Sequence, residues 1–304
     1  MKATKVKFAS IVRTAAMLLA GSAAAEEGGK AISSTSTTKT HISLGTATPG
    51  GGFPLYGNAL AEVMNAADPE LAIEPRNTKG SNENIPLLEA GQLDIALVAG
   101  EPAYAAFSGI GRDKSNVKIL TAIYSSPGMF VVRADSPYKT IRDLVGQPIA
   151  FGAKGSGLPI MSRYVLDGRA AALWGAGIGW PGFDAVAKSP AGARFIAPDA
   201  KELTQIRAKH SFLKALTIPA NSYPGQTAPI DSVGSWSYIL VRNSLSDDVA
   251  YHLARTLHSV EGDLCKKLPQ ACETTAANTV AAAPDIALIH PGVMKYLKEI
   301  GAAK

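Results

Sequence analysis

The sequence predicts an α/β fold, and three observations lead to this prediction. A short strand, a glycine-rich bend and an amphipathic helix follow one another within residues 42–67. Three predicted strands end in glycine-rich or polar loops, as the strands of an open α/β sheet do. The chain has 304 residues, of which 46% are hydrophobic, and this is enough for two α/β domains or one large one.

The first strand–bend–helix unit has the composition of an anion-binding loop. Ile42 and Leu44 alternate with small polar residues, and the bend Gly45–Gly52 leaves backbone N–H groups uncovered before a helix begins. Free N–H groups and a helix N-terminus favour a carboxylate or a phosphate. A tight turn without a ligand has the same pattern. The bend is neither a G-x-G-x-x-G motif nor a P-loop, because the lysine of a P-loop is absent.

Two more strand ends are expected beside this bend. The loop Asn77–Asn82 follows a short strand and precedes a helix that Ser81 or Asn82 can cap. The loop Ala99–Glu101 follows the apolar strand Leu93–Val98. Because parallel strands end at one edge of a sheet, we expect these loops to converge on a ligand site there.

The middle of the chain repeats the pattern and suggests a second unit. A strand at Ile149–Gly152 leads through the bend Gly155–Gly157 into a helix. Two similar strands, Phe130–Ser136 and Tyr238–Ser244, bracket this part of the chain. They predict a double crossing between two domains, although two ordinary sheet strands would have the same pattern.

The last part of the chain predicts two helices. Five apolar residues spaced for one helical face predict a single long helix over residues 249–264. The sequence His290-Pro291-Gly292 then breaks the chain before a final helix.

The N-terminus has the parts of a secretory signal peptide. Residues 1–25 contain a basic start, an apolar run and an A-x-A site, and residues 26–40 form a Gly/Ser/Thr-rich leader expected to be flexible. Removing the four basic residues of the signal takes the formal net charge from +5 to +5 − 4 = +1. A near-neutral protein gives no reason to expect binding to nucleic acid or to an anionic membrane. Outside the N-terminal segment, the sequence contains no apolar run of about 18 residues, so no membrane span is predicted. We therefore expect a periplasmic protein that is not embedded in a membrane.

The only two cysteines, Cys265 and Cys272, flank a short loop that contains a proline. An oxidising compartment could close this loop with a disulfide. A metal site would need two further ligands nearby, and the sequence supplies none. We predict a structural disulfide and no metal.

The sequence contains no recognisable catalytic motif. No serine has glycine at both −2 and +2, and the five histidines are scattered without H-E-x-x-H. We therefore expect neither an enzyme nor a cofactor.

The order of these motifs resembles the TAXI family, the solute-binding receptors of TRAP transporters. The bend Leu44–Tyr56 is similar to the first motif of the family, and Gly80–Asn84 with Gly91–Asp94 is similar to the second. Further similar motifs follow in family order: Leu120–Tyr124, Val131–Ala134, Ile141–Gly146, Gly155–Gly157, Trp180-Pro181 and His290–Gly292.

The resemblance implies a periplasmic-binding-protein type II-like fold, with two α/β lobes joined by two crossing segments and a ligand cleft between them. It assigns residues 41–132 plus 243–304 to lobe one and residues 133–242 to lobe two. It implies a monomer that closes on a small solute, an organic anion or amino acid such as glutamate or 2-oxoglutarate, and delivers it to a TRAP permease. The residues that it places at the solute are Thr48, Gly51, Gly52, Phe53 and Glu101 in lobe one, and Gly155, Ser156, Gly157, Trp180 and Tyr223 in lobe two.

The chain departs from the family pattern at three positions. Phe53 stands where a tyrosine hydroxyl is usual, and Glu101 stands where a shorter residue is common. Near residues 166–170 a strand–helix pair of roughly 20 residues is expected to be missing from lobe two. The shorter lobe is either a compact natural variant or a deletion that weakens folding or closure, and we favour the second.

Two other functions remain open. A ligand-sensing periplasmic protein of the same fold would report to a sensor and not to a permease. A hydrolase or transferase is the third hypothesis, and the missing motifs speak against it.

Overall fold

A computed structural model describes residues 39–151, 158–179, 181–210 and 212–304. The predicted signal peptide, residues 1–25, lies outside the described residues, and so does the leader except for its last two residues. The bend Gly155–Gly157 and Trp180 also lie outside them. Residues 38–304 form one compact unit. No helix in the described part of the chain is long and apolar enough to cross a membrane.

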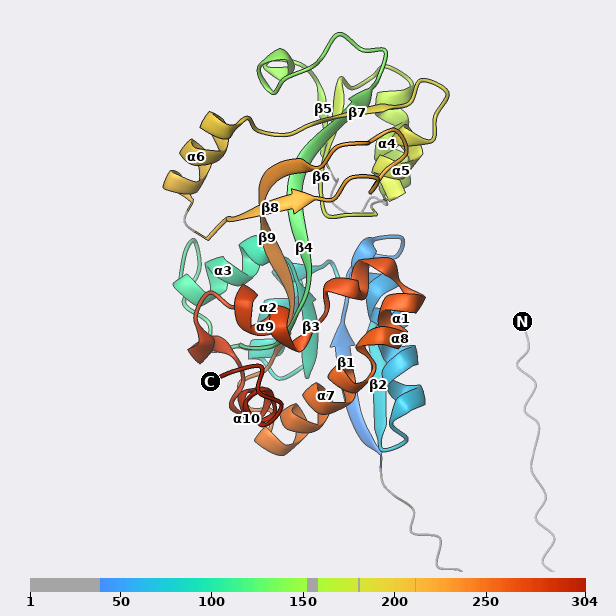
Figure 1. Cartoon of the computed structure of the whole chain (residues 1–304). Coiled ribbons are helices and arrows are strands. Elements are labelled where there is room, and N and C mark those ends of the chain that lie inside the picture. The colour runs from blue at the N-terminus through green and yellow to red at the C-terminus, as the bar shows by residue number, and fades with distance from the viewer. Residues whose placement is uncertain (1–38, 152–157, 180, 211) are drawn as a thin grey trace, which may run out of the picture. The chain divides into compact units, whose positions relative to one another are not determined.

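Lobe one consists of the elements around the largest hydrophobic core. Its sheet has the order β2-β1-β3-β9-β4, in which β1 is parallel to β2 and β3, and β9 is antiparallel to its neighbours (Figure 1). The elements found only in lobe one are β1 (Thr40–Gly45), α1 (Gly52–Ala67), β2 (Leu71–Arg76), α2 (Ser81–Glu89), β3 (Ile95–Val98), α3 (Gly100–Ser108), α7 (Asp247–Ser259), α8 (Glu261–Lys267), η2 (Pro269–Glu273), α9 (Ala276–Ala282), η3 (Ile286–Leu288) and α10 (Pro291–Glu299).

Lobe two consists of the elements around two smaller cores. In its sheet β5 is parallel to β6, and both β6 and β7 are antiparallel to β4, while β8 is antiparallel to β9. The elements found only in lobe two are η1 (Arg142–Leu144), β5 (Ile149–Ala150), α4 (Leu158–Leu166), β6 (Ala172–Ala176), α5 (Pro181–Ala187), β7 (Ala193–Ile196), α6 (Ala200–Lys209) and β8 (Lys214–Ile218).

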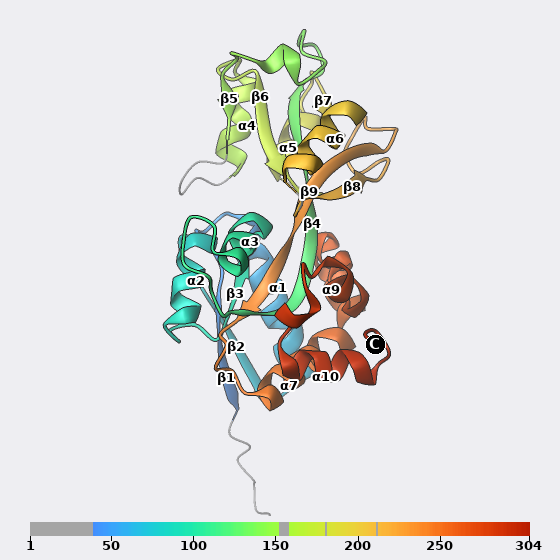
Figure 2. The same cartoon turned by 90° about the vertical axis from the view of Figure 1, so that its left-hand side faces the viewer.

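Two long strands belong to both lobes. β4 (Lys118–Arg133) and β9 (Ile230–Val241) pair side by side and run from one lobe into the other (Figures 1 and 2). Along β4 the buried side chains change from the core of lobe one at Ile123 to that of lobe two at Met129. At Gly234 there is no space for a side chain, because an added Cβ would lie 2.0 Å from the carbonyl oxygen of Ser126. The residue limits expected for the two lobes remain predictions.

Buried polar side chains fasten the strands of lobe one to one another. The Nδ2 of Asn84, which is fully buried, donates to the carbonyl oxygens of Thr46 and Leu97, both at 2.8 Å. Asn84 thereby ties the end of β1 to the end of β3. Its place in the motif Gly80–Asn84 is therefore explained by the fold, because the Nδ2 group finds two carbonyl acceptors, while the buried Oδ1 has no partner among the described residues.

Asp94 plays a similar part at the other end of β3. Its carboxylate accepts hydrogen bonds from the N–H and the hydroxyl of Ser43 and from the Nε of Arg242, at 2.8–3.0 Å. Burial by itself would raise the pKa of Asp94, but these donors outweigh it and hold the pKa below its ordinary value. Asp94 thus joins β1, β3 and the end of β9 as a carboxylate.

Two predictions about helix ends are wrong. The residue that caps α2 is Gly80, with φ +96°, because the hydroxyl of Ser81 accepts a hydrogen bond from the N–H of Ala99 instead. The predicted long helix is divided at Val260 into α7 and α8. There the hydroxyl of Ser259 donates to the carbonyl of Thr256, and the N–H of Val260 donates to the carbonyl of Leu257. The side-chain hydrogen bond thus replaces a helical one.

The segment of lobe two where a strand–helix pair is expected to be missing forms a complete turn. α4 ends at Leu166 and is followed by Gly168, with φ +74°, and the N–H of Ala170 returns to the carbonyl of Tyr164 at 2.8 Å. The N–H of Ala171 then donates to the carbonyl of Pro148, and β6 pairs with β5 in parallel. β5, α4 and β6 therefore form a βαβ unit with no break at residues 166–170.

The predicted disulfide between Cys265 and Cys272 is confirmed. It closes a loop that contains Gln270, whose Nε2 donates to the carbonyl oxygens of Ile178 at 3.0 Å and Gly179 at 3.2 Å. Because Gln270 lies in η2 and its two acceptors follow β6, this side chain links the two lobes.

Candidate ligand-binding site

The carboxyl ends of β1 and β3 open onto a cavity of about 270 Å³. The cavity lies beside the paired strands β4 and β9, and β6 of lobe two adds one wall residue. It is lined by Ala47, Gly52, Phe53, Ala99, Glu101, Tyr124, Ser126, Ala176, Ser235 and Ser237. We call it the cleft cavity.

Three of the predicted site residues line the cleft cavity: Gly52, Phe53 and Glu101. Thr48 and Gly51 lie just before them, in a turn closed by a hydrogen bond of 3.2 Å from the N–H of Gly51 to the carbonyl of Thr48. This turn brings the chain from β1 to the first residue of α1. Gly155, Ser156, Gly157 and Trp180 lie outside the described residues, so their contribution stays a prediction.

Tyr223 lies apart from the cleft cavity, in a core of lobe two. Its side chain is 2% exposed and stacks on Phe195 with ring centroids 4.8 Å apart. Its hydroxyl donates to the carbonyl of Gly177 at 3.1 Å. In this structure Tyr223 therefore supports the loop after β6 and is not among the described residues that line the cavity.

Two helices begin at the wall of the cleft cavity. α1 starts at Gly52 and α3 starts at Gly100, and neither Gly51 nor Ala99 provides a side chain that caps the helix. The first N–H groups of a helix have no acceptor within the helix, and the helix dipole adds partial positive charge at this end. The end of α1 therefore favours an anionic group in the cavity, whereas the first turn of α3 already contains the carboxylate of Glu101.

Glu101 is the only charged side chain among the described residues that line the cleft cavity. Its Oε1 accepts a hydrogen bond of 2.9 Å from the hydroxyl of Ser235, so the carboxylate is directed toward β9. A carboxylate only accepts hydrogen bonds and attracts positive charge. The cavity therefore presents one place for an anion and one for a cation.

Tyr124 supplies a further hydroxyl near the N-terminus of α1. A Cβ atom added at Gly52 would lie 4.0 Å from this hydroxyl, and Tyr124 lies opposite Ser237 in the pairing of β4 with β9. Burial raises the pKa of Tyr124 well above the usual value of a phenol. The hydroxyl therefore keeps its proton at neutral pH and can donate it in a hydrogen bond.

Sequence reasoning did not assign the polar residues of the crossing strands to the site. Tyr124 and Ser126 alternate on β4, and Ser235 and Ser237 alternate on β9. Residues two apart on a strand share a face, so these four side chains reach one cavity. The polar alternation around Trp236 was a signal in the sequence that could have identified the pair on β9.

Several solved structures are similar to this chain. The substrate-binding protein of an amino acid ABC transporter is 14% identical, with a TM-score of 0.41 over 76% of this chain and 99% of that one. An ancestral arginine-binding protein bound to glutamine is 14% identical, with a TM-score of 0.45 over 76% and 97%. An H₂O₂-bound cysteine-to-serine mutant of OxyR from Corynebacterium glutamicum is 11% identical, with a TM-score of 0.46 over 76% and 70%.

The family comparison covers most of the described chain. A model of the NMT1-like family matches residues 44–170 and 162–301, and the two matches meet where the sequence indicates a shortened lobe. The fold class predicted from the sequence is confirmed as a periplasmic-binding-protein type II-like α/β fold. The chain belongs to the NMT1-like family.

Proposed function

We propose that the protein is an extracytoplasmic solute-binding receptor of the TAXI type, which captures a small solute and delivers it to the permease of a TRAP transporter. The cleft cavity carries this proposal, because two uncapped helix N-termini and the carboxylate of Glu101 meet there beside the strands that join the lobes. The secretory pattern of residues 1–25 supports the extracytoplasmic location.

The charges of the cleft cavity favour a solute that carries both a carboxylate and an ammonium group. The end of α1 attracts the carboxylate, and Glu101 in the first turn of α3 attracts the ammonium. A dicarboxylate such as 2-oxoglutarate or succinate would satisfy the end of α1 but meet the like charge of Glu101. We therefore propose that amino acids such as glutamate or glutamine bind more tightly than these dicarboxylates.

Binding is coupled to closure of the lobes in this proposal. Lobe one and the two crossing strands line the cavity together with Ala176 of lobe two. A solute that contacts both lobes binds the closed form more tightly than the open form and shifts the equilibrium toward it. The permease would then recognise the closed form.

Titration calorimetry of the protein with glutamate, glutamine, 2-oxoglutarate and succinate tests the proposal. We expect heat of binding from the two amino acids and at least roughly tenfold weaker binding of the dicarboxylates, as expected for one misplaced charge. If none of the four binds to protein that circular dichroism shows to be folded, the proposed solute class is wrong.

Glu101→Gln tests the role assigned to the carboxylate. We expect the variant to bind glutamate about tenfold or more weakly, because its amide attracts the ammonium less, while its affinity for 2-oxoglutarate is maintained or increased. Glu70→Gln is the matched control, since Glu70 is exposed and absent from the cavity wall. An equal loss of affinity for both solutes would contradict the assignment.

A further inference from the structure

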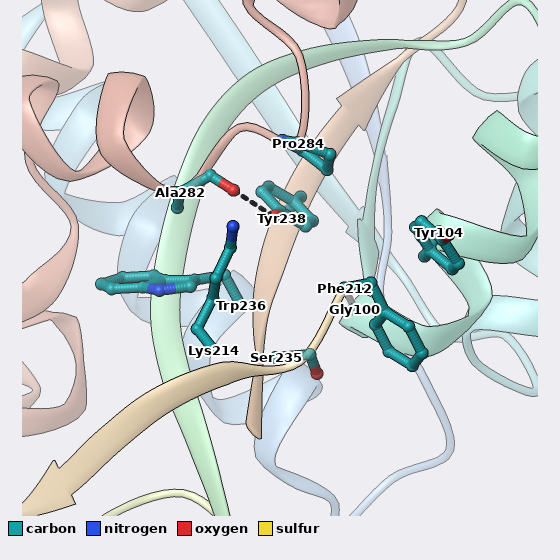
Figure 3. Close-up of a pocket in the computed structure, with 9 residues that line it drawn as sticks. All are labelled: Gly100, Tyr104, Phe212, Lys214, Ser235, Trp236, Tyr238, Ala282 and Pro284. Carbon is teal, nitrogen blue, oxygen red and sulfur yellow. Dashed lines mark hydrogen bonds between the residues drawn. The ribbon is translucent and has the colours of Figure 1, made fainter. Parts of the chain in front are cut away.

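A second cavity, of about 180 Å³, lies against β9 and is shown in Figure 3. Ser237 lines the cleft cavity, whereas Trp236 and Tyr238 line this second one. Ser235 lines both cavities, so the two are neighbours that share this residue of β9. We call the second one the rear cavity.

Aromatic rings form the walls of the rear cavity. Tyr104 of α3 and Phe212, which precedes β8, stack with ring centroids 4.4 Å apart and planes inclined by 15°. Figure 3 places this pair on one side of the cavity and Trp236 on the other. The residue is only partly buried and lines the cavity, so part of its surface can meet a ligand. Flat aromatic walls favour an aromatic ligand through offset or edge-to-face contacts.

Lys214 brings a positive charge to the same cavity. In Figure 3 its ammonium group extends into the space between Trp236 and Tyr238. Among the described residues, none that lines the rear cavity is acidic, and Lys214 forms no ion pair. The hydroxyl of Tyr238 is already used, because it donates to the carbonyl of Ala282 at 2.8 Å. The ammonium is therefore the group that can bind an anion here.

We propose that the rear cavity binds a small aromatic carboxylate with a single ring, separately from the solute in the cleft cavity. The volume fits this class, because a cavity of roughly 150 Å³ accommodates one benzene molecule. The carboxylate pairs with Lys214, and the ring lies between Trp236 and the stacked pair Tyr104 and Phe212. The inference does not depend on the proposed function, since it uses a different cavity and a different ligand.

Calorimetric titration of the full chain with benzoate tests this inference, with benzamide and acetate as comparison ligands. Benzamide keeps the ring and removes the charge, and acetate keeps the charge and removes the ring. We expect benzoate to bind about tenfold or more tightly than either one, because the site needs both groups. Equal affinity of benzoate and benzamide, or no binding of benzoate to folded protein, would overturn the inference.

Two lysine variants locate the binding. Lys214→Met is expected to weaken benzoate binding about tenfold or more, since a charge-assisted hydrogen bond is lost. Lys209→Met is the matched control, because Lys209 is an exposed lysine at the end of α6 that does not line the cavity. We expect the control to change the affinity less than about twofold. If the two variants bind benzoate equally well, Lys214 does not hold the carboxylate and the inference fails.

Tryptophan fluorescence tests independently whether benzoate binds beside Trp236. Benzoate bound beside Trp236 should change the emission of the protein, and Trp236→Phe should remove this change while a ring remains in the wall. A fluorescence change that persists in full in Trp236→Phe would put benzoate elsewhere and overturn the inference.

Discussion

Lobe one and lobe two are built on the same plan but to different extents. Lobe one contains the run β1-α1-β2-α2-β3, whereas the described residues of lobe two contain only β5-α4-β6 between the corresponding points. β5 corresponds to β1 and β6 to β3, because each pair is parallel and its second strand lies beside a crossing strand. Within these ranges, lobe two has no counterpart of β2 or α2.

The difference shows that a lobe can form without counterparts of β2 and α2. β1 is covered by β2, while β5 is the last strand of its sheet in the described chain, and Val145 and Phe151 near it are 77% and 57% exposed. The βαβ unit still closes, but around two small cores in place of one large core. Because less apolar surface is buried per residue in a smaller unit, we expect lobe two to be the less stable lobe.

The largest expected effect comes from truncating equivalent core leucines. Leu97 of β3 and Leu173 of β6 are both 0% exposed, so Leu97→Ala and Leu173→Ala should each cost about 2–5 kcal/mol of unfolding free energy. In urea we expect Leu97→Ala to unfold in one transition, and Leu173→Ala in two, because lobe two then unfolds before lobe one. Val145→Ala is the exposed control, with an expected change of about 0.5 kcal/mol or less. One shared transition in Leu173→Ala would contradict the difference between the lobes.

A smaller effect distinguishes a polar contact of lobe one from a polar contact of lobe two. Only the contribution of the first to stability is expected to change with pH. Asp94→Asn in lobe one should cost about 1–2 kcal/mol at pH 7, from charge-assisted hydrogen bonds discounted for partial exposure. The pKa of Asp94 is lowered by folding, so its contribution is present above about pH 4 and is lost as the pH falls through the lower folded pKa. The difference between wild type and Asp94→Asn should therefore shrink between pH 7 and pH 3.

Arg194 of lobe two gives the comparison for this pH test. Its guanidinium donates to the carbonyl oxygens of Ala134, Ser136 and Tyr138 at 2.8–3.1 Å. Because arginine stays charged at both pH values, the cost of Arg194→Met should be the same at pH 7 and pH 3. If the cost of Asp94→Asn is equally constant in urea unfolding, Asp94 does not contribute as a carboxylate.

The smallest effect concerns the link between the lobes. Gln270→Ala removes two hydrogen bonds to lobe two and should cost about 0.5–1 kcal/mol. Combined with Leu173→Ala, it should move the two urea transitions further apart, because the lobes then unfold more independently. Gln92→Ala, at an exposed glutamine outside the lobe contact, is the control. An unchanged separation would mean that Gln270 does not couple the lobes.

The sequence predicted the positions of the strands better than the structural roles of the motif residues. Alternation and apolar runs identified the segments of β1, β2, β3 and β5, because these strands have buried faces. The predicted strands Phe130–Ser136 and Tyr238–Ser244 overlap β4 and β9 only at residues 130–133 and 238–241. The motif residues Asn84 and Asp94 could not be distinguished from ligand contacts, since both roles require polar groups beside strand ends. The side-chain bond of Ser259 that divides α7 from α8 is equally invisible in an apolar pattern.

The sequence predicted only those site residues that lie in a loop directly after a predicted strand. Gly52 and Phe53 come from the bend after β1, and Glu101 comes from the loop after β3. Tyr124, Ser126, Ser235 and Ser237 come from two strands more than 100 residues apart, which meet only through their pairing. The register of that pairing, including its shifts between Ile119 and Tyr124, is a property of the folded sheet.

The joint between the lobes has a mechanical consequence. β4 and β9 remain paired through it, and at Gly234 there is no space for a side chain. A loop hinge rotates freely about a few backbone bonds, whereas a paired ribbon can turn only by changing its twist while keeping its ladder of hydrogen bonds. In the proposed closure, the ribbon would therefore resist large changes of twist and limit how far the lobes turn.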